Sequence, residues 1–212
     1  AWPQFTAPVD GLDIHFLHIV GEAGGKRPLL LTHGWPGSVF EFYDALGPLA
    51  YPSRHGGKAE DAFDLIVPSL PGYGFSGKPA SPLGQKATAA LWDKLMREVL
   101  GYDTYLAQGG DWGSLVTSWL GLNHSVEAGG GCKAIHLNMV GLRPPSLAPE
   151  TPEEIEWLKA SQAIMQSETA YLQQQATKPQ TLAMALMDSP VGTAAWIIEK
   201  FHGWSDLSAG GL

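Results

Sequence analysis

The chain has 212 residues, which is enough for one domain or for one core with a small insertion. Hydrophobic residues make up 44% of it, so it can bury a sizeable core, and a net charge of -8 without a basic stripe argues against a nucleic-acid partner. The single cysteine, Cys132, excludes an internal disulfide framework and a cysteine-rich metal site, and no apolar run approaches the length of a membrane span.

Strand and helix signals alternate over residues 1–142. Short runs rich in apolar residues predict strands at 13–20, 28–32, 63–67, 104–108 and 133–138. Longer stretches between them predict helices at 38–49, 85–100 and 112–122. The polar segment 50–60 predicts a surface loop. This alternation is typical of βαβ units and predicts a mainly parallel sheet flanked by helices.

Residues 143–212 carry helix signals with no strand signals between them. Residues 151–154 (TPEE) offer a threonine N-cap, a proline at the first helical position and a glutamate that can close a capping box. Helices are expected at 152–175 and 190–200. Helices without intervening strands predict a helical lid over the carboxyl ends of the strands, where a pocket is expected.

Residues 109–113 (GGDWG) have the Gly-x-nucleophile-x-Gly spacing of a nucleophile elbow, with Asp111 where a serine or cysteine usually stands. The flanking glycines allow a sharp turn from a strand into a helix, which lifts the central side chain into a pocket. Gly-Gly-Asp alone is more typical of a surface turn. The predicted strand before it and the predicted helix after it favour the elbow.

An aspartate nucleophile suits one class of substrate. A serine that attacked a saturated carbon would leave an ether, whereas a carboxylate leaves an alkyl ester that water can hydrolyse. Asp111 therefore predicts alkylating electrophiles such as epoxides or alkyl halides, and the lack of a Gly-x-Ser-x-Gly motif argues against a generic esterase. Three readings stay open: an epoxide hydrolase, a haloalkane dehalogenase that holds halide with Trp112, and a non-catalytic fragment.

Two further loops precede the elbow, and each follows a predicted strand: 33–38 (HGWPGS) and 68–76 (PSLPGYGFS). A tight Gly/Pro loop after a central strand can aim backbone N–H groups at the pocket. We therefore expect the N–H groups of Trp35 and Trp112 to form an oxyanion hole. The side chain of His33 is expected to be structural.

These three motifs, in this order, resemble the microsomal-type epoxide hydrolases of the α/β-hydrolase fold family. Segment 5–20 resembles the family's entry into its core, and segment 170–201 resembles its cap domain, so the resemblance covers essentially the whole chain. It implies an α/β-hydrolase fold with a partial core at 1–142 and a partial helical cap at 143–212.

The resemblance also implies the remaining parts of the site. Tyr171 matches the first of two cap tyrosines that protonate the opened epoxide. The second tyrosine, the catalytic histidine and its relay acid are expected beyond Leu212, and a further segment is expected before Ala1. Because none of the seven histidines fits the catalytic role, a chain ending at Leu212 is expected to be alkylated at Asp111 without turnover.

The implied reaction converts a small-molecule epoxide into a vicinal diol, as in detoxification, and needs no cofactor and no metal. The resemblance allows a homodimer. The cytoplasm is the expected location, and any membrane anchor would precede Ala1. The sequence does not determine which epoxide is used or its stereochemistry.

Overall fold

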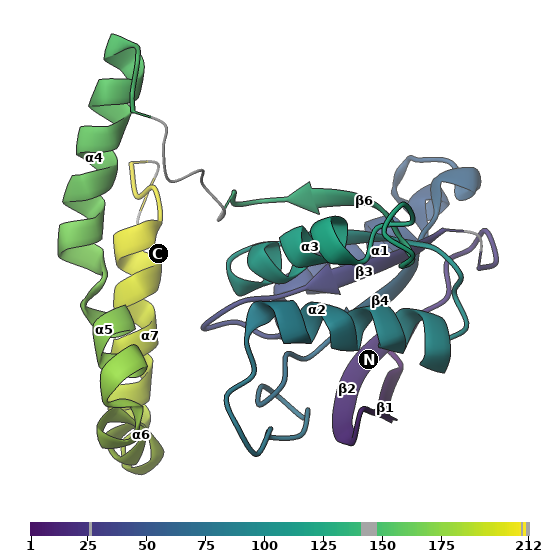
Figure 1. Cartoon of the computed structure of the whole chain (residues 1–212), viewed down its shortest axis with the longest axis horizontal. Coiled ribbons are helices and arrows are strands. Elements are labelled where there is room, and N and C mark those ends of the chain that lie inside the picture. Colours follow the sequence, from purple (N-terminus) through teal and green to yellow (C-terminus); the bar gives the residue numbers. More distant parts are fainter. Residues whose placement is uncertain (26, 141–147, 209, 211–212) are drawn as a thin grey trace. The chain divides into compact units, whose positions relative to one another are not determined.

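The computed structural model of this chain describes residues 1–25, 27–140, 148–208 and 210. The chain divides into two compact units, Ala1–Arg143 and Pro144–Leu212. The first unit, called the sheet unit below, holds a sheet flanked by helices, and the second, called the helical unit, is made of helices (Figure 1). The expected domain boundary at residues 142 and 143 lies outside the described residues.

The strands of the sheet unit form one mixed sheet in the order β1-β2-β4-β3-β5-β6. Their bounds are β1 Gln4–Val9, β2 Leu12–Ile19, β3 Pro28–Thr32, β4 Asp64–Pro68, β5 Tyr105–Gly109 and β6 Cys132–Leu137. β3 pairs in parallel with β4 and β5, and β5 pairs in parallel with β6, whereas β2 runs antiparallel to β1 and β4. The expected mainly parallel sheet is confirmed, and the loops after β3, β4 and β5 leave it at the same edge.

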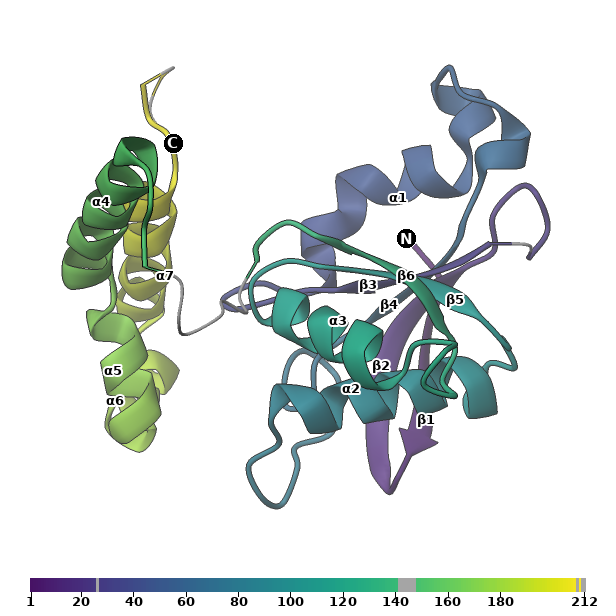
Figure 2. The same ribbon diagram turned by 45° about the horizontal axis from the view of Figure 1, so that its top comes forward.

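Helices cover both faces of this sheet (Figure 2). They are η1 Val39–Phe42, α1 Tyr43–Ala50, η2 Pro52–His55, η3 Ala59–Asp61, α2 Gln85–Lys94, the π-helical turn η4 Leu95–Val99 and α3 Trp112–Asn123. Side chains of β3 alternate between the two faces. Leu30 belongs to the buried cluster that contains Trp92 of α2, and Leu31 belongs to the cluster that contains Leu46 of α1. The strand that ends at the site is therefore anchored on both faces.

The sheet unit differs from the expectations at three points. The strand expected at 13–20 is present as β2, but it forms a hairpin with β1, which was not predicted; the chain turns between them at Asp10 and Gly11, which both have positive φ (48° and 79°). Glycine adopts that region freely, and aspartate tolerates it better than most residues. The helix expected at 85–100 changes at Leu95 from α to π geometry. The expected loop at 50–60 holds the short turns η2 and η3.

The helical unit consists of α4 Pro152–Glu168, α5 Ala170–Thr177, α6 Pro179–Asp188 and α7 Pro190–Trp204. The expected capping box is confirmed: the Glu154 N–H donates to Thr151 Oγ1, and the Thr151 N–H donates to the Glu154 carboxylate. The expectation of one helix up to residue 175 is wrong, because α4 ends at Glu168, with Thr169 as its C-cap, and α5 begins separately at Ala170. α6, which was not predicted, begins at a proline, and the residue before a proline disfavours helical geometry.

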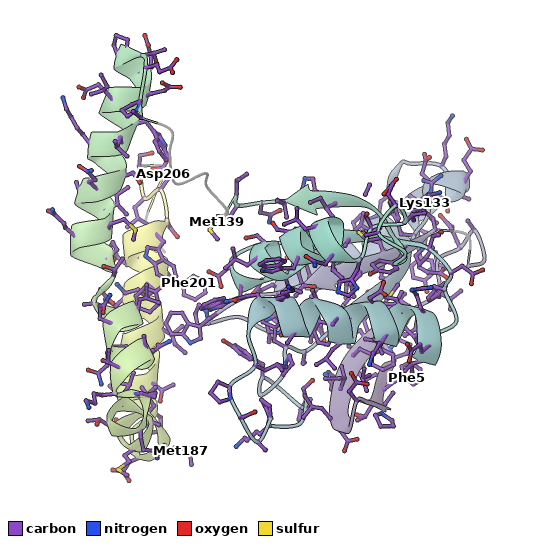
Figure 3. All side chains as sticks on the ribbon, in the orientation of Figure 1. Phe5, Lys133, Met139, Met187, Phe201 and Asp206 are labelled. Carbon is purple, nitrogen blue, oxygen red and sulfur yellow. The ribbon has the colours of Figure 1, made fainter. Side chains whose placement is uncertain are left out.

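Among the residues that the structure describes, no single helix is long and apolar enough to cross a membrane. α6 and α7 meet those limits of length and composition only together, as a pair bent by 120°. Several apolar side chains of the helical unit are exposed, including Met187 near the end of α6 and Phe201 on α7 (Figure 3).

Candidate functional site

Asp111 occupies the turn between β5 and α3, as the elbow spacing predicts. Its backbone has φ 50° and ψ -125°, a conformation that non-glycine residues rarely adopt and that costs about 1–3 kcal/mol. The flanking glycines are required by close packing. A Cβ on Gly109 would meet the carbonyl oxygen of Gly113, and a Cβ on Gly113 would meet the carbonyl oxygen of Thr32. The turn is therefore wedged against the end of β3.

The loop after β3 holds the Asp111 carboxylate. The backbone N–H of Trp35 donates a hydrogen bond to Asp111 Oδ1 over 2.8 Å. The loop passes so close that a Cβ on Gly34 would meet the same carboxylate. Hydrogen bonds to a charged acceptor are worth about 1.5–3 kcal/mol. This contact therefore fixes one carboxylate oxygen and leaves Oδ2 as the oxygen without this hydrogen bond.

Trp112, the other expected donor, is the first residue of α3. Backbone N–H groups in the first turn of a helix have no partner within the helix, and the helix dipole places partial positive charge there. The side chain of Trp112 is 36% exposed. The N–H of Trp112 is thus a donor of the required kind directly after Asp111.

The side chain of His33 joins two of the loops. It is fully buried, its Nδ1–H donates to the Gly34 carbonyl over 3.0 Å, and its Nε2 accepts from the Leu70 N–H over 3.0 Å. These bonds define one neutral tautomer. Burial lowers the pKa of His33, although the Gly34 carbonyl and the Asp111 charge act in the opposite direction. His33 therefore fastens the loop after β3 to the loop after β4.

Two groups near Asp111 escaped the sequence prediction. Tyr73, whose ring meets the His33 ring edge-on at 5.4 Å, has its pKa raised by burial and by the negative charge of Asp111. Glu41 is more than a third exposed, yet its carboxyl fills the space where a Cβ on Gly37 would project. Burial of the Glu41 carboxyl against the loop after β3 raises its pKa, and the negative charge of Asp111 raises it further. A hydrogen bond with the Gly34 backbone acts in the opposite direction.

Tyr171 lies in the helical unit, as the second residue of α5. Its ring meets the ring of Trp204 edge-on at 5.2 Å, and the Lys200 ammonium lies 5.4 Å from its centroid. Its side chain is half-buried in that setting. Side chains of α7 therefore contribute to the environment of Tyr171.

Within the described ranges, no group of three or more histidine, cysteine, aspartate or glutamate side chains is placed to hold a metal ion. The histidines of the sheet unit serve packing where they are buried. His15 Nδ1 lies 2.9 Å from Ser69 Oγ, and His18 Nε2 lies 3.0 Å from the Tyr102 hydroxyl. Both contacts join residues that are far apart in the sequence, and they connect the β1–β2 hairpin to the rest of the sheet unit.

Comparison with known proteins gives consistent results. One family model, described as alpha/beta hydrolase fold, matches residues 27–194, and another, described as Epoxide hydrolase N terminus, matches residues 1–42. A protein of Stigmatella aurantiaca, provisionally named an epoxide hydrolase, is 48% identical over 209 residues, which are 97% of this chain and 46% of that protein. Epoxide hydrolase 1 of Oryctolagus cuniculus is 39% identical over 240 residues, covering 100% of this chain and 51% of its own length.

The solved structure of the epoxide hydrolase from Aspergillus niger is also similar. It matches 95% of this chain and 52% of its own, with a TM-score of 0.80 and 37% sequence identity. This chain thus spans about half the length of the relatives that it matches.

Proposed function

Because this chain belongs to the alpha/beta hydrolase fold family and is similar to proteins named as epoxide hydrolases, we propose that the protein opens epoxides through an ester formed on Asp111. The observation that carries the proposal is the hydrogen bond from the Trp35 N–H to Asp111 Oδ1. Asp111 supplies a carboxylate at the elbow, where a hydroxyl or thiol is usual, and this hydrogen bond supports its orientation by the loop after β3. A carboxylate there forms a cleavable ester with a saturated carbon.

In the first step, Asp111 Oδ2 attacks one epoxide carbon from behind. A bond forms between Oδ2 and that carbon while the bond from carbon to the ring oxygen breaks. The electron pair goes to the ring oxygen, which takes a proton from the hydroxyl of Tyr171. A phenol, with a reference pKa of about 10, is neutral at pH 7 and far more acidic than the alkoxide that it protonates.

In the second step, water attacks the carbonyl carbon of the Asp111 ester. The negative charge collects on Oδ1, which already accepts the Trp35 N–H, and the N–H of Trp112 is the second donor. Loss of one such donor typically costs about 3–4 kcal/mol of barrier. Cleavage of the bond between the carbonyl carbon and Oδ2 restores the carboxylate and releases a vicinal diol. One proton of the water ends on the departing alkoxide oxygen of the diol, and the other returns to the Tyr171 phenolate. The family resemblance assigns activation of this water to a histidine.

In this proposal the part of the helical unit in the chemistry is the Tyr171 hydroxyl.

The test is to incubate the protein with styrene oxide and to look for the ester. Intact-mass spectrometry should show a gain equal to one epoxide, and peptide mapping should place it on Asp111. The Asp111→Asn variant should show no gain, because a neutral amide is a poor nucleophile, and Asp188→Asn in the helical unit is the matched control that should still be alkylated.

Three results would count against the proposal. The adduct could map to another residue, or it could persist in Asp111→Asn. Halide could also be released from 1-chlorobutane while styrene oxide leaves no ester and forms no diol, which would favour a haloalkane dehalogenase instead.

A further inference from the structure

Lys200 of α7 is placed unusually for a lysine. Among the described residues of the helical unit (148–208 and 210), it is the only one that is buried, with 3% of its surface exposed. Lysine is almost never fully buried unless it is paired. Its Nζ lies 2.9 Å from Glu168 Oε2 and 3.0 Å from Glu199 Oε1. Loss of water alone would lower the pKa of Lys200, but the two carboxylates outweigh it and raise the pKa. The side chain is therefore a buried ammonium ion.

The same ammonium lies over two aromatic rings. Its Nζ is 5.4 Å from the centroid of Tyr171 and 5.8 Å from the centroid of Trp204. Cations within about 6 Å of a ring face are attracted to it, and more strongly where water is excluded. Trp204 and Lys200 are one helical turn apart on α7, so both contact the Tyr171 ring from the same face of that helix.

Lys200 contacts both sides of a helix break. Glu168 is the last residue of α4, and Tyr171 is the second residue of α5. A second link lies one turn further on, where the Trp196 indole N–H donates to Gln175 Oε1 over 3.1 Å. Side chains of α7 therefore hold the beginning and the middle of α5.

We propose that Lys200 is a positioning residue for Tyr171, holding the phenol in place to give its proton to the opening epoxide. This inference rests on the proposed function, in which Tyr171 is the proton donor. Orientation, rather than charge, is its main contribution. Glu168 and Glu199 carry two negative charges against one ammonium, so the cluster offers little net help to a developing phenolate.

The alternative is that Lys200 only stabilises the helical unit. A double-mutant cycle separates the two, because residues that act through one another are non-additive. The measurement is the single-turnover rate of ester formation on Asp111, using the full-length protein with styrene oxide, rapid quenching and mass spectrometry. The variants are Lys200→Met, Tyr171→Phe and the double variant.

Misplacement of a reacting group by about 1 Å can cost up to about a hundredfold in rate. We expect Lys200→Met to slow ester formation by about tenfold or more at saturating epoxide, with the half-saturating concentration changed by less than about threefold. In the Tyr171→Phe background the same change should have no further effect. Lys200→Arg, which keeps a cation over the ring, should recover most of the rate.

The matched control is Lys159→Met. Lys159 pairs with Glu156 over 2.9 Å in the same unit, but both side chains are largely exposed, so its loss should leave the rate unchanged. If Lys200→Met does not fold, as judged by its far-UV circular dichroism, Glu168→Gln keeps the shape and removes one ion pair. It should slow ester formation by about threefold, and only when Tyr171 is present.

If Lys200→Met slows ester formation equally in the parent protein and in Tyr171→Phe, or does not slow it at all, the positioning role of Lys200 is overturned. The proposed role of Tyr171 as proton donor is unaffected by that result. A Tyr171→Phe variant that forms the ester at the parent rate instead removes Tyr171 from the proposed function, and the role of Lys200 falls with it.

Discussion

Replacement of Gly113 by alanine should destabilise the sheet unit by about 3 kcal/mol, near the upper end for overpacking. A Cβ at this position would lie 2.7 Å from the carbonyl carbon of Thr32 and 2.9 Å from the carbonyl oxygen of His33, and closer still to the Thr32 oxygen. All three are backbone atoms. Thr32 is paired with Gly109 in the sheet, so the obstacle cannot rotate away as a flexible side chain would.

Thermal denaturation followed by near-ultraviolet circular dichroism measures this loss. At about 2–4 °C per kcal/mol for a chain of this size, the midpoint should fall by about 6–12 °C. Gly84→Ala is the matched control, because Gly84 has φ -85° and no atom within 4 Å of an added Cβ. A Gly113→Ala protein that melts within about 2 °C of the parent would refute the packing argument.

Three further changes test the site and its support. Gly34→Ala should both lower stability and slow ester formation, because its Cβ would meet the Cβ and the carboxylate of Asp111 and displace them; a parent-like single-turnover rate would contradict this. Burial lowers the pKa of His33 below its ordinary 6.5, so as the pH falls the unfolded chain takes up a proton before the folded protein does. The urea midpoint of unfolding should therefore fall as the pH drops below 6.5 and level off below the folded pKa. His33→Gln should weaken that pH dependence. Tyr105→Phe removes the hydroxyl that donates to Asp93 over 2.8 Å and should cost about 1.5–3 kcal/mol in urea unfolding, and a loss below 0.5 kcal/mol would mean that the hydroxyl contributes little.

Local patterns predicted the features that depend on local chemistry. The spacing of residues 109–113 placed Asp111 between a strand and a helix because only glycine fits where the turn packs on β3. The predicted strand at 28–32 coincides with β3, Pro28–Thr32, because a short continuous apolar run between turn signals is typical of a buried strand. The threonine, proline and glutamate before α4 form the capping box because all of its contacts lie within four residues.

Features that depend on contacts far along the chain were not predictable in the same way. Glu41 and Tyr73 reach the surroundings of Asp111 only because η1 and the loop after β4 lie at the same edge of the sheet. The break after Glu168 is another case. The apolar pattern continues through it, and α5 is held separately by side chains of α7, which follows more than 20 residues later.

The imidazole of His33 links the segments that follow two neighbouring strands. A substitution in the loop after β4, although remote from Asp111, can shift the loop after β3 through that ring. It can thereby change how the Asp111 carboxylate is oriented toward a substrate. Selectivity in such a molecule can evolve, or be engineered, through changes that never touch the bound compound.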